Sequence, residues 1–540
     1  MIKSYLTVLA SLFVFQLQAQ YVSGVTVPDS TKTLITDESD LSVKYANTIT
    51  AEDMERHLSV LASDGYEGRE TGTVGNQRAA GYISNFFKTM EMTAPGLENS
   101  YFQPIALTYS KWDDIDIFVG ENHYRHLRDF IAFPNKNTSE IAINAEEVIY
   151  LGYGIDDPKY SDYKKNDVKG KVILINKGEP IKKDSTSWIT GTNEMSDWTK
   201  DSAKKLIAAK KNGVKLVLII EDDIKGLIGQ NRRLLIGEYV ELGDKTQEEI
   251  PYANHMYISS TIARDIIGKK EKKIIKSRKR SNKKGKACDV KVKSKLIVNH
   301  SKSVRTLKGQ NVVGFIEGTD KKDEVIVVSA HYDHLGKRGD DVYNGADDNG
   351  SGTTTVMELA EAFRLAESGG NGPRRSILFL LLTGEEKGLL GSEYYSAFPM
   401  YDLDKTVANV NIDMVGRVDK NYTENPDYIY VIGSDRLSTD LHKINEKANE
   451  DYAGLTLDYK YNSESDPNRF YFRSDHYNFA KNGIPAIFFF NGVHADYHMT
   501  SDTVEKINFE KMQKVGRLIF HTTWELANRE DRIVVDGEIK

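Results

Sequence analysis

Glu324-Val-Ile-Val-Val-Ser-Ala330 leads into His331-Tyr-Asp333, and Gly345-Ala-Asp-Asp-Asn-Gly-Ser-Gly352 follows shortly afterwards. The first segment is rich in β-branched residues and does not alternate with polar ones, which is typical of a strand buried on both faces. From Thr353 to Ala366, apolar residues recur at helical spacing. A histidine and several carboxylates therefore lie where a strand crosses to a helix. Ligands of open α/β sheets bind outside the carboxyl ends of the strands, so we expect a site here.

Three later segments repeat this arrangement of an apolar strand followed by polar ligands. Arg375-Ser-Ile-Leu-Phe-Leu-Leu-Leu382 ends before Glu385 and Glu386, Val407-Ala-Asn-Val-Asn-Ile412 ends before Asp413, and Ile484-Pro-Ala-Ile-Phe-Phe-Phe490 leads to Tyr497 and His498. Each predicted strand thus delivers an oxygen or imidazole ligand. A lone histidine or a pair of glutamates at one strand end is commonly structural, but that explanation requires separate coincidences at four strand ends.

The length of 540 residues is too great for one hydrophobic core, so we expect two domains, or one domain with a large insertion. A hydrophobic content of 39% and a charged content of 28% are ordinary for a globular protein. The net charge of −7 and the pI near 6.0 provide no overall attraction for nucleic acid or for an anionic membrane.

The N-terminus resembles a secretory signal peptide. Met1-Ile-Lys3 supplies a basic start, Tyr5 to Leu17 an apolar core, and Ala19 a small residue for cleavage, so residues 1–19 are expected to be removed. No cysteine follows the apolar run to carry a lipid, and no other run approaches the ~20 apolar residues of a membrane span. Cys288 is the only cysteine, so no internal disulfide is possible. These features predict a secreted or periplasmic protein.

The chain between the N-terminus and the ligand-rich half contains several different kinds of segment. Residues 20–49 are predicted to be a linker, and Thr50-Ala-Glu-Asp53 is a capping pattern that starts a helix. The glycine-rich loop at 65–75 lacks the preceding strand and the lysine of a phosphate-binding loop. Residues 134–302 are expected to form a β-rich domain without catalytic residues. Its strongly basic stretch at 269–286 is interpreted as a solvated surface segment rather than a site for an acidic partner.

Two imidazoles and three carboxylates form the candidate ligand set, which is His331, Asp348, Glu386, Asp413 and His498. This mixture suits zinc, or a similar divalent metal, better than calcium, which prefers oxygen alone. One metal does not need five protein ligands, whereas two metals do if one carboxylate bridges them. Three carboxylates and a bridging hydroxide would neutralise two divalent ions. Paired metals about 3.5–4 Å apart acidify a shared water and clamp the reacting oxygens.

The motifs closely resemble those of the di-zinc aminopeptidases related to aminopeptidase Y and bacterial leucyl aminopeptidase. The motifs are His331-Tyr-Asp333, Gly345 to Gly352, Gly384 to Ser392, Asn411 to Met414, Ser474-Asp475-His476 and Tyr497 to Thr503. The resemblance implies an α/β fold with a mixed, mostly parallel sheet and helices on both faces. It assigns residues 50–133 and 303–530 to the zinc peptidase domain. Residues 134–302 then resemble the protease-associated domain that many members carry as an insertion.

The resemblance also implies a role for each residue. Asp348 would bridge two zinc ions per chain, with His331 and Asp413 completing one zinc site and Glu386 and His498 the other. Glu385 would be the general base, Tyr497 the donor to the oxyanion, and Asp333 the acid behind His331. It further implies a cis peptide bond between Asp348 and Asn349. We expect an exported exopeptidase that removes N-terminal residues from peptides with a free N-terminus.

Two other functions remain open from the sequence. A metal-free binding protein on the same fold is possible, because some relatives have lost their zinc ligands, but the complete ligand set argues against it. The same scaffold also supports glutaminyl cyclases and glutamate carboxypeptidases. A carboxypeptidase needs cations for the substrate carboxylate, and Arg417, Arg469 and Arg473 lie near the motifs.

Overall fold

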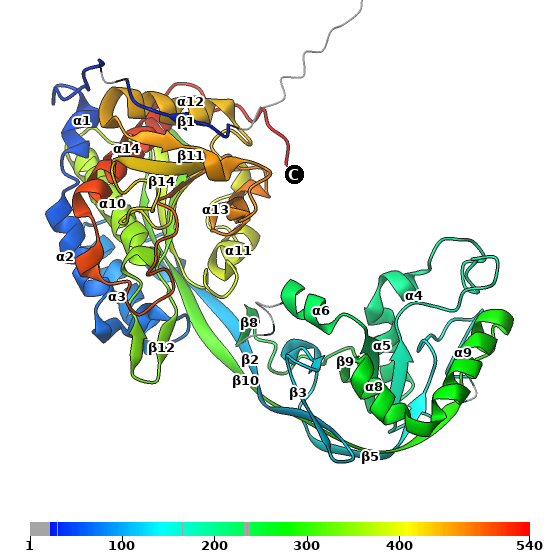
Figure 1. Cartoon of the computed structure of the whole chain (residues 1–540). Coiled ribbons are helices and arrows are strands. Elements are labelled where there is room, and N and C mark those ends of the chain that lie inside the picture. Colours follow the sequence, from blue (N-terminus) through cyan, green and yellow to red (C-terminus); the bar gives the residue numbers. More distant parts are fainter. Residues whose placement is uncertain (1–21, 30, 165, 232–234, 236–237, 540) are drawn as a thin grey trace, which may run out of the picture. The chain divides into compact units, whose positions relative to one another are not determined.

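The computed structural model describes residues 22–29, 31–164, 166–231, 235 and 238–539 (Figure 1). The expected signal peptide at 1–19 lies outside these described residues. The chain divides into two compact units, one made of Met1–Ile105 and Lys308–Lys540 and the other of Ala106–Leu307. Within the described ranges, no helix is both long and apolar enough to cross a membrane.

The first unit is built on a mixed, mostly parallel sheet. Three parallel strands form its centre, namely β11 (Lys321–His331), β14 (Arg375–Leu382) and β15 (Thr406–Ile412). Strand β18 (Ala486–Phe490) continues the parallel pairing beyond β15, whereas β10 (Val290–Ile316) pairs antiparallel with β14. The edge beyond β18 consists of β16 (Tyr428–Ile432), β17 (Thr456–Asp458) and β1 (Val25–Thr26).

Helices cover both faces of this sheet, as Figure 1 shows. One face packs against α2 (Ala51–Leu61), α3 (Val74–Thr89), α10 (Gly352–Ser368) and α14 (Phe509–Asn528), and the other against α11 (Leu390–Ala397) and α13 (His476–Ala480). Successive side chains of a strand point to opposite faces. Accordingly Ile326 and Val328 of β11 join the first core and Val325 and Val327 the second. The predicted α/β class, a mixed sheet with helices on both faces, is confirmed for this unit.

Helix α2 begins where the sequence places a capping residue. The Thr50 side chain accepts a hydrogen bond of 3.1 Å from the Asp53 N–H and so caps α2, as its spacing predicts. Helix α10 extends from Gly352 to Ser368, slightly beyond the expected 353–366. Two further helices of this unit are α1 (Leu41–Ala46), which lies within the expected linker, and α12 (Thr439–Ala448).

The second unit contains four parallel neighbouring strands, β5 (Glu140–Tyr150), β6 (Val172–Asn176), β7 (Leu216–Glu221) and β9 (His255–Ser259). At either end of this series, β10 pairs antiparallel with β5 and β4 (Phe130–Ile131) with β9. The second unit begins at Ala106, whereas we expected the insertion to begin at residue 134. The difference arises because Ile117, Val119 and Tyr124, on β2 (Phe102–Val119) and β3 (Asn122–Arg125), are buried in the core of this second unit.

The basic stretch of the second unit is mostly helical. Helix α9 spans Glu271–Lys284 and buries Ile274, Ser277 and Ser281 on one side, while its lysines and arginines are exposed. Two shorter helices, α5 (Ser202–Lys211) and α8 (Ser260–Ile267), accompany it. The charged face is therefore solvated, in line with the interpretation drawn from the sequence.

Candidate metal centre

Three parallel strands bring their final residues to one edge of the sheet. His331 is the last residue of β11, and it lies opposite Leu382, the last residue of β14. Glu385 and Glu386 follow β14 directly, and Asp413 follows Ile412 at the end of β15. Since parallel strands end at the same edge, an imidazole and three carboxylates gather there.

Asp348 reaches the same edge from the turn that precedes α10. The peptide bond between Asp348 and Asn349 is cis, as the family resemblance implied. The Asp502 carboxylate accepts hydrogen bonds from the N–H groups of Asp347 and Asp348, at 3.0 and 3.2 Å. The Asn349 side-chain amide donates to the Ile412 carbonyl at 2.9 Å. The turn is therefore tied both to β15 and to the loop around Asp502.

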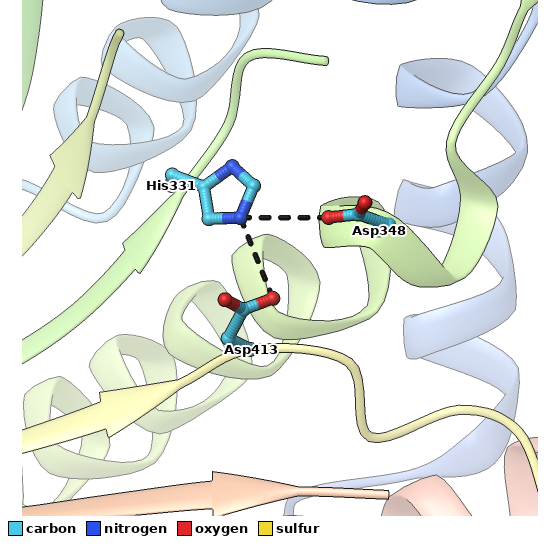
Figure 2. Close-up of side chains that lie close together, drawn as sticks. All are labelled: His331, Asp348 and Asp413. Atoms are coloured by element: carbon cyan, nitrogen blue, oxygen red, sulfur yellow. Dashed lines mark ion pairs between the residues drawn. The ribbon is translucent and has the colours of Figure 1, made fainter. Parts of the chain in front are cut away.

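His331, Asp348 and Asp413 form the first ligand cluster, shown in Figure 2. Nε2 of His331 lies 3.6 Å from Oδ1 of Asp348 and 3.4 Å from Oδ1 of Asp413. The Ser474 hydroxyl donates to the other oxygen of Asp413 at 2.8 Å, which fixes the orientation of the carboxylate. All three ligand groups are buried, so three potential metal ligands converge on one point.

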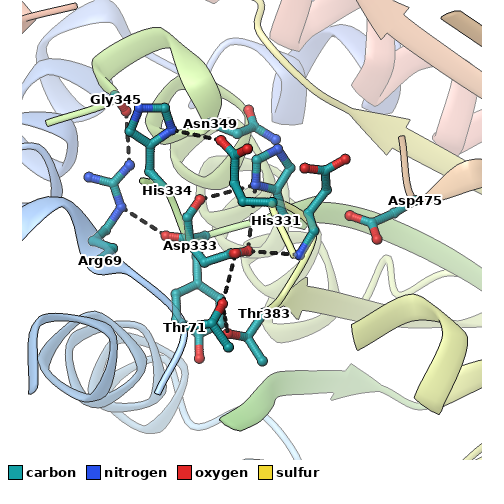
Figure 3. Close-up of polar contacts among 12 residues, drawn as sticks. Arg69, Thr71, His331, Asp333, His334, Gly345, Asn349, Thr383 and Asp475 are labelled. Carbon is teal, nitrogen blue, oxygen red and sulfur yellow. Dashed lines mark hydrogen bonds and ion pairs between the residues drawn. The ribbon is translucent and has the colours of Figure 1, made fainter. Parts of the chain in front are cut away.

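The second cluster shares Asp348 and lies on its other oxygen. Nε2 of His498 is 3.0 Å from Oδ2 of Asp348 and 3.4 Å from Oε1 of Glu386. A further imidazole, His334, places Nδ1 3.0 Å from the same Glu386 oxygen and 3.7 Å from Oδ2 of Asp348 (Figure 3). Asp348 therefore presents one oxygen to each cluster, which is the arrangement that a bridging ligand requires.

All five expected ligands lie together, and the sequence reasoning missed one residue beside them. His334 stands three positions after His331 and directly after Asp333, so the local pattern is His-Tyr-Asp-His. A second histidine that close to a strand-end histidine was the available signal. It was overlooked because a residue beyond the strand end has no periodicity that fixes its direction.

Asp333 lies behind His331, as expected, but it orients the imidazole mainly through its backbone. Nδ1 of His331 lies 3.1 Å from the Asp333 carbonyl oxygen and 3.7 Å from its carboxylate. Donation from Nδ1 to that carbonyl leaves Nε2 to face Asp348 and Asp413. The Asp333 carboxylate instead accepts from the Thr71 hydroxyl at 2.8 Å and from the Glu385 N–H at 3.2 Å, which positions Glu385 (Figure 3).

The glycine-rich loop at 65–75 supports the site rather than binding phosphate. Arg69 is buried and donates to the backbone carbonyls of Tyr332, Asn344 and Gly345 at 2.8, 2.7 and 2.9 Å (Figure 3). Burial lowers the pKa of Arg69 to about 10, a value that still leaves the guanidinium charged at neutral pH. This cation therefore holds both ends of the segment between His331 and Asp348.

The two adjacent glutamates experience opposite electrostatic environments. Burial raises the pKa of Glu385 well above its ordinary value, and the nearby carboxylates Glu386 and Asp413 raise it further. Burial also opposes ionisation of Glu386, but its contacts with His334 and His498 outweigh that effect and hold its pKa well below the usual range. Glu386 is thus stabilised as an anion and Glu385 as a proton acceptor of unusual basicity.

The chemistry of this donor set fits divalent metal ions. Oε1 of Glu386, Oδ1 of Asp413 and both ring nitrogens of His334 are buried and have no hydrogen-bond partner among the described residues. Unpartnered buried polar atoms are costly, and here Oε1 of Glu386, Oδ1 of Asp413 and Nδ1 of His334 all face other ligands of the two clusters. Imidazole nitrogens and carboxylate oxygens at such separations are the ligands that zinc takes in proteins.

A small cavity of about 40 Å³ opens beside the clusters. Asp348, Glu385 and Asp413 line it together with Tyr497, Arg473 and the apolar side chains Met414, Phe470, Phe488, Phe490 and Val493. Burial and the nearby carboxylates raise the pKa of Tyr497, so its phenol remains protonated and able to donate a hydrogen bond. The expected base and the expected donor therefore face the same space.

The three arginines near the motifs have different surroundings. Arg417 is paired with Asp496 at 2.7 Å and with Asp502 at 3.6 Å. Arg469 lies over the ring of Phe472 and lines a different cavity. Arg473 lines the cavity beside the ligand clusters, with its guanidinium 4.8 Å from the centre of the Phe470 ring.

Comparisons with known proteins agree with this geometry. The family model described as "Peptidase family M28" matches residues 311–523. This range contains all of the expected metal ligands, from His331 to His498. The matched residues therefore include both ligand clusters and the strands that carry them.

Two curated relatives and one solved structure illustrate the likeness. Aminopeptidase YwaD of Bacillus subtilis is 28% identical over 231 residues, which are 41% of this chain and 46% of that protein. A probable leucine aminopeptidase of Trichophyton verrucosum is 32% identical over 215 residues, 38% of this chain and 55% of that one. The chain spans about half the length of these relatives. The aminopeptidase from Aneurinibacillus sp. strain AM-1 shares the fold, with a TM-score of 0.52, 19% identity and coverage of 91% of this chain and 98% of that one.

Proposed function

We propose that this protein is a zinc-dependent aminopeptidase that removes N-terminal residues from peptides. The observation that carries the proposal is the position of Asp348, whose two carboxylate oxygens face two separate ligand clusters. His331 and Asp413 would hold one zinc ion with Asp348, and Glu386 and His498 would hold a second. When bound, two such ions acidify a water molecule and polarise the scissile carbonyl group.

The residues of the cavity would then perform the proton transfers. Glu385 takes a proton from the attacking water and returns it to the leaving amine, because its buried carboxylate is adjacent to the ligands without belonging to either cluster. The protonated phenol of Tyr497 donates a hydrogen bond to the oxyanion of the tetrahedral intermediate. Asp333 holds both His331 and the Glu385 N–H, so the base stays beside the ligands.

The cavity supports cleavage at a chain end. Its volume of about 40 Å³ and its aromatic lining favour a small group such as the end of a chain. Two of the three arginines near the motifs have other surroundings, because Arg417 pairs with two aspartates and Arg469 lines another cavity. A free N-terminal amine beside several carboxylates is the better match.

Arg473 keeps a second candidate open. It is the one of these arginines that lines the cavity with Glu385 and Tyr497, so a glutamate-carboxypeptidase-like activity would place the substrate carboxylate against it. The test compares matched peptides with free and blocked N-termini. An aminopeptidase releases the first residue of the free peptide alone, and Arg473→Ala leaves that activity largely unchanged. Release of C-terminal residues from blocked peptides, lost in Arg473→Ala, would establish the alternative.

The proposal extends to the rest of the chain in two respects. We propose that the second unit is a protease-associated domain, supported by its position as an insertion between Ile105 and Lys308. We also propose export through the signal peptide at 1–19, supported by its sequence pattern. Determination of the N-terminal residue of protein recovered outside the cytoplasm tests the export proposal, since cleavage after Ala19 predicts Gln20 as the first residue.

A further inference from the structure

His334 is a buried imidazole for which the five-ligand set provides no role. Its side chain is fully buried, and neither ring nitrogen has a hydrogen-bond partner among the described residues. Nδ1 nevertheless lies 3.0 Å from Oε1 of Glu386 and 3.7 Å from Oδ2 of Asp348. These are the same two carboxylate oxygens that His498 approaches from the open side of the site.

Ordinary core packing does not account for this position. His300 and His476 are also buried histidines without hydrogen bonds, but within the described part of the chain neither forms an ion pair with a carboxylate. His476 instead stacks on the Phe488 ring, with centroids 4.7 Å apart. His334 alone of these three directs a nitrogen at a cluster of carboxylates that could hold a metal ion.

We infer that His334 is an additional protein ligand of the second metal site, binding through Nδ1. The inference rests on the proposed function, because it concerns the same site. Glu386, Asp348, His498 and His334 would then supply two oxygens and two nitrogens to this metal, whereas His331, Asp348 and Asp413 supply one nitrogen and two oxygens to the other. Since a neutral imidazole adds no charge, the electrical balance of the centre is unchanged.

The direction of the His334 ring is set by the backbone around it. A Cβ atom placed on Gly345 would come within 2.5 Å of the His334 ring, so the Gly345 backbone lies directly against the imidazole. Gly345 has a φ of 54°, and its carbonyl accepts a 2.9 Å hydrogen bond from the buried Arg69. Arg69 and Gly345 therefore hold the ring in place independently of any bound metal.

The two histidines of this site differ in exposure. The side chain of His498 is 36% exposed, whereas that of His334 is 0% exposed. Glu386, Asp348 and His334 thus form a buried set of three ligands that does not depend on the loop of His498. Three protein ligands are sufficient to hold zinc with one position left for water or substrate. The consequence is a second metal site that survives the loss of His498.

The decisive measurement is the number of imidazoles bound to zinc in the unaltered protein, determined by X-ray absorption spectroscopy. If His334 is a ligand, His331, His334 and His498 together give three imidazoles for two zinc ions. A count of two imidazoles for two zinc ions would overturn the inference and leave the proposed function intact. Purified protein that binds no zinc at all would overturn the proposed function as well.

Variants provide a second test through zinc content rather than activity. We expect His498→Ala to keep two zinc ions per chain and the double variant His334→Ala/His498→Ala to keep one. His300→Ala is the matched control, because it removes a buried, unbonded histidine in the second unit and should not change zinc content. Near-ultraviolet circular dichroism confirms that each variant is folded. Loss of one zinc ion from folded His498→Ala would contradict the inference.

Discussion

Nε2 of His494 lies 3.2 Å from Oδ2 of Asp347, and both side chains are buried. Asp347 immediately precedes Asp348, and His494 lies on the loop that also carries Tyr497 and His498. The other oxygen of Asp347 accepts hydrogen bonds from the Gly416 N–H at 2.7 Å and the Ser351 hydroxyl at 2.9 Å. One aspartate therefore joins the turn of Asp348, the chain after β15 and the loop of His498.

This contact predicts the effect of Asp347→Asn. The amide retains the size of the side chain but loses the charge that holds His494, so the loop of His498 should be held less firmly. Partners of metal ligands typically contribute roughly 10–100-fold to metal affinity or activity. We expect a loss of that order in zinc affinity, measured by competition with a chelator. Asp427→Asn, an exposed acid paired with Lys514, is the control, and equal losses in both variants would refute the role of Asp347.

Replacement of the two adjacent glutamates separates the base from the ligand. Glu385→Gln leaves both clusters whole but cannot accept a proton, so kcat should fall by roughly 10²–10⁴-fold while zinc content stays normal. Glu386→Ala removes the only carboxylate that the second cluster does not share with the first, so the loss of negative charge should lower zinc content even though Asp348 and the imidazoles remain. Zinc per chain and kcat on an amino-acid p-nitroanilide are measured for both. Zinc loss in Glu385→Gln with none in Glu386→Ala would mean that the two residues exchange roles.

Metal removal should abolish hydrolysis. Without a cation, buried oxygens of Glu386 and Asp413 lack a hydrogen-bond partner among the described residues, and no residue lining the cavity replaces the acidity that zinc gives to water. We expect an extensively chelated sample to be inactive and to regain activity in proportion to added zinc. Full activity in protein shown by elemental analysis to be free of metal would disprove the mechanism.

A buried carboxylate outside the site predicts how stability changes with pH. Burial raises the pKa of Glu358 to about 8 from the ordinary 4.5, and its neighbour His57, 3.8 Å away, has a pKa lowered by burial to about 4 from 6.5. Glu361 and Asp53 raise the pKa of Glu358 further, and Arg56 opposes them. Between pH 4.5 and 8, Glu358 therefore stays protonated in the folded protein, whereas it is ionised in the unfolded chain.

The sign of the effect follows from these two shifts. The stability due to protonated Glu358 is fully present below pH 4.5 and is lost as the pH rises through 8, whereas that of neutral His57 is present above 6.5. Between pH 6.5 and 8, Glu358 is the only member of this pair that makes the free energy of unfolding depend on pH. That free energy falls by at most about 1.4 kcal/mol per pH unit. The free energy of unfolding, measured with urea, should fall less steeply with rising pH for Glu358→Gln than for wild type. Glu367→Gln, a more exposed acid of the same helix, should decline as wild type does, and identical slopes in all three proteins would refute the assignment.

Much of the fold could be predicted from local patterns, and so could the meeting of the ligands that follow its central strands. The uninterrupted apolar runs of β11, β14 and β15 marked strands buried on both faces, and the structure buries every residue of β14 and β15. Because the carboxyl ends of parallel strands meet, the residues after those runs had to come together. The limit of this reasoning is visible at Ala106, where the second unit begins well before the expected residue 134. The strands β2 and β3 have no composition that distinguishes one core from the other.

The sequence alone determined which residues end the strands, and therefore that His331, Glu386 and Asp413 share one edge of the sheet. It did so because strand periodicity and polar residues at strand ends are local properties. Only the tertiary structure decided where His334 points, since the Gly345 backbone against its ring is held by Arg69, 276 positions away in the chain. Likewise, the pairing of His494 with Asp347 joins two loops that no local pattern connects. The direction of a side chain in a loop is set by contacts between distant segments, and those exist only once the chain has folded.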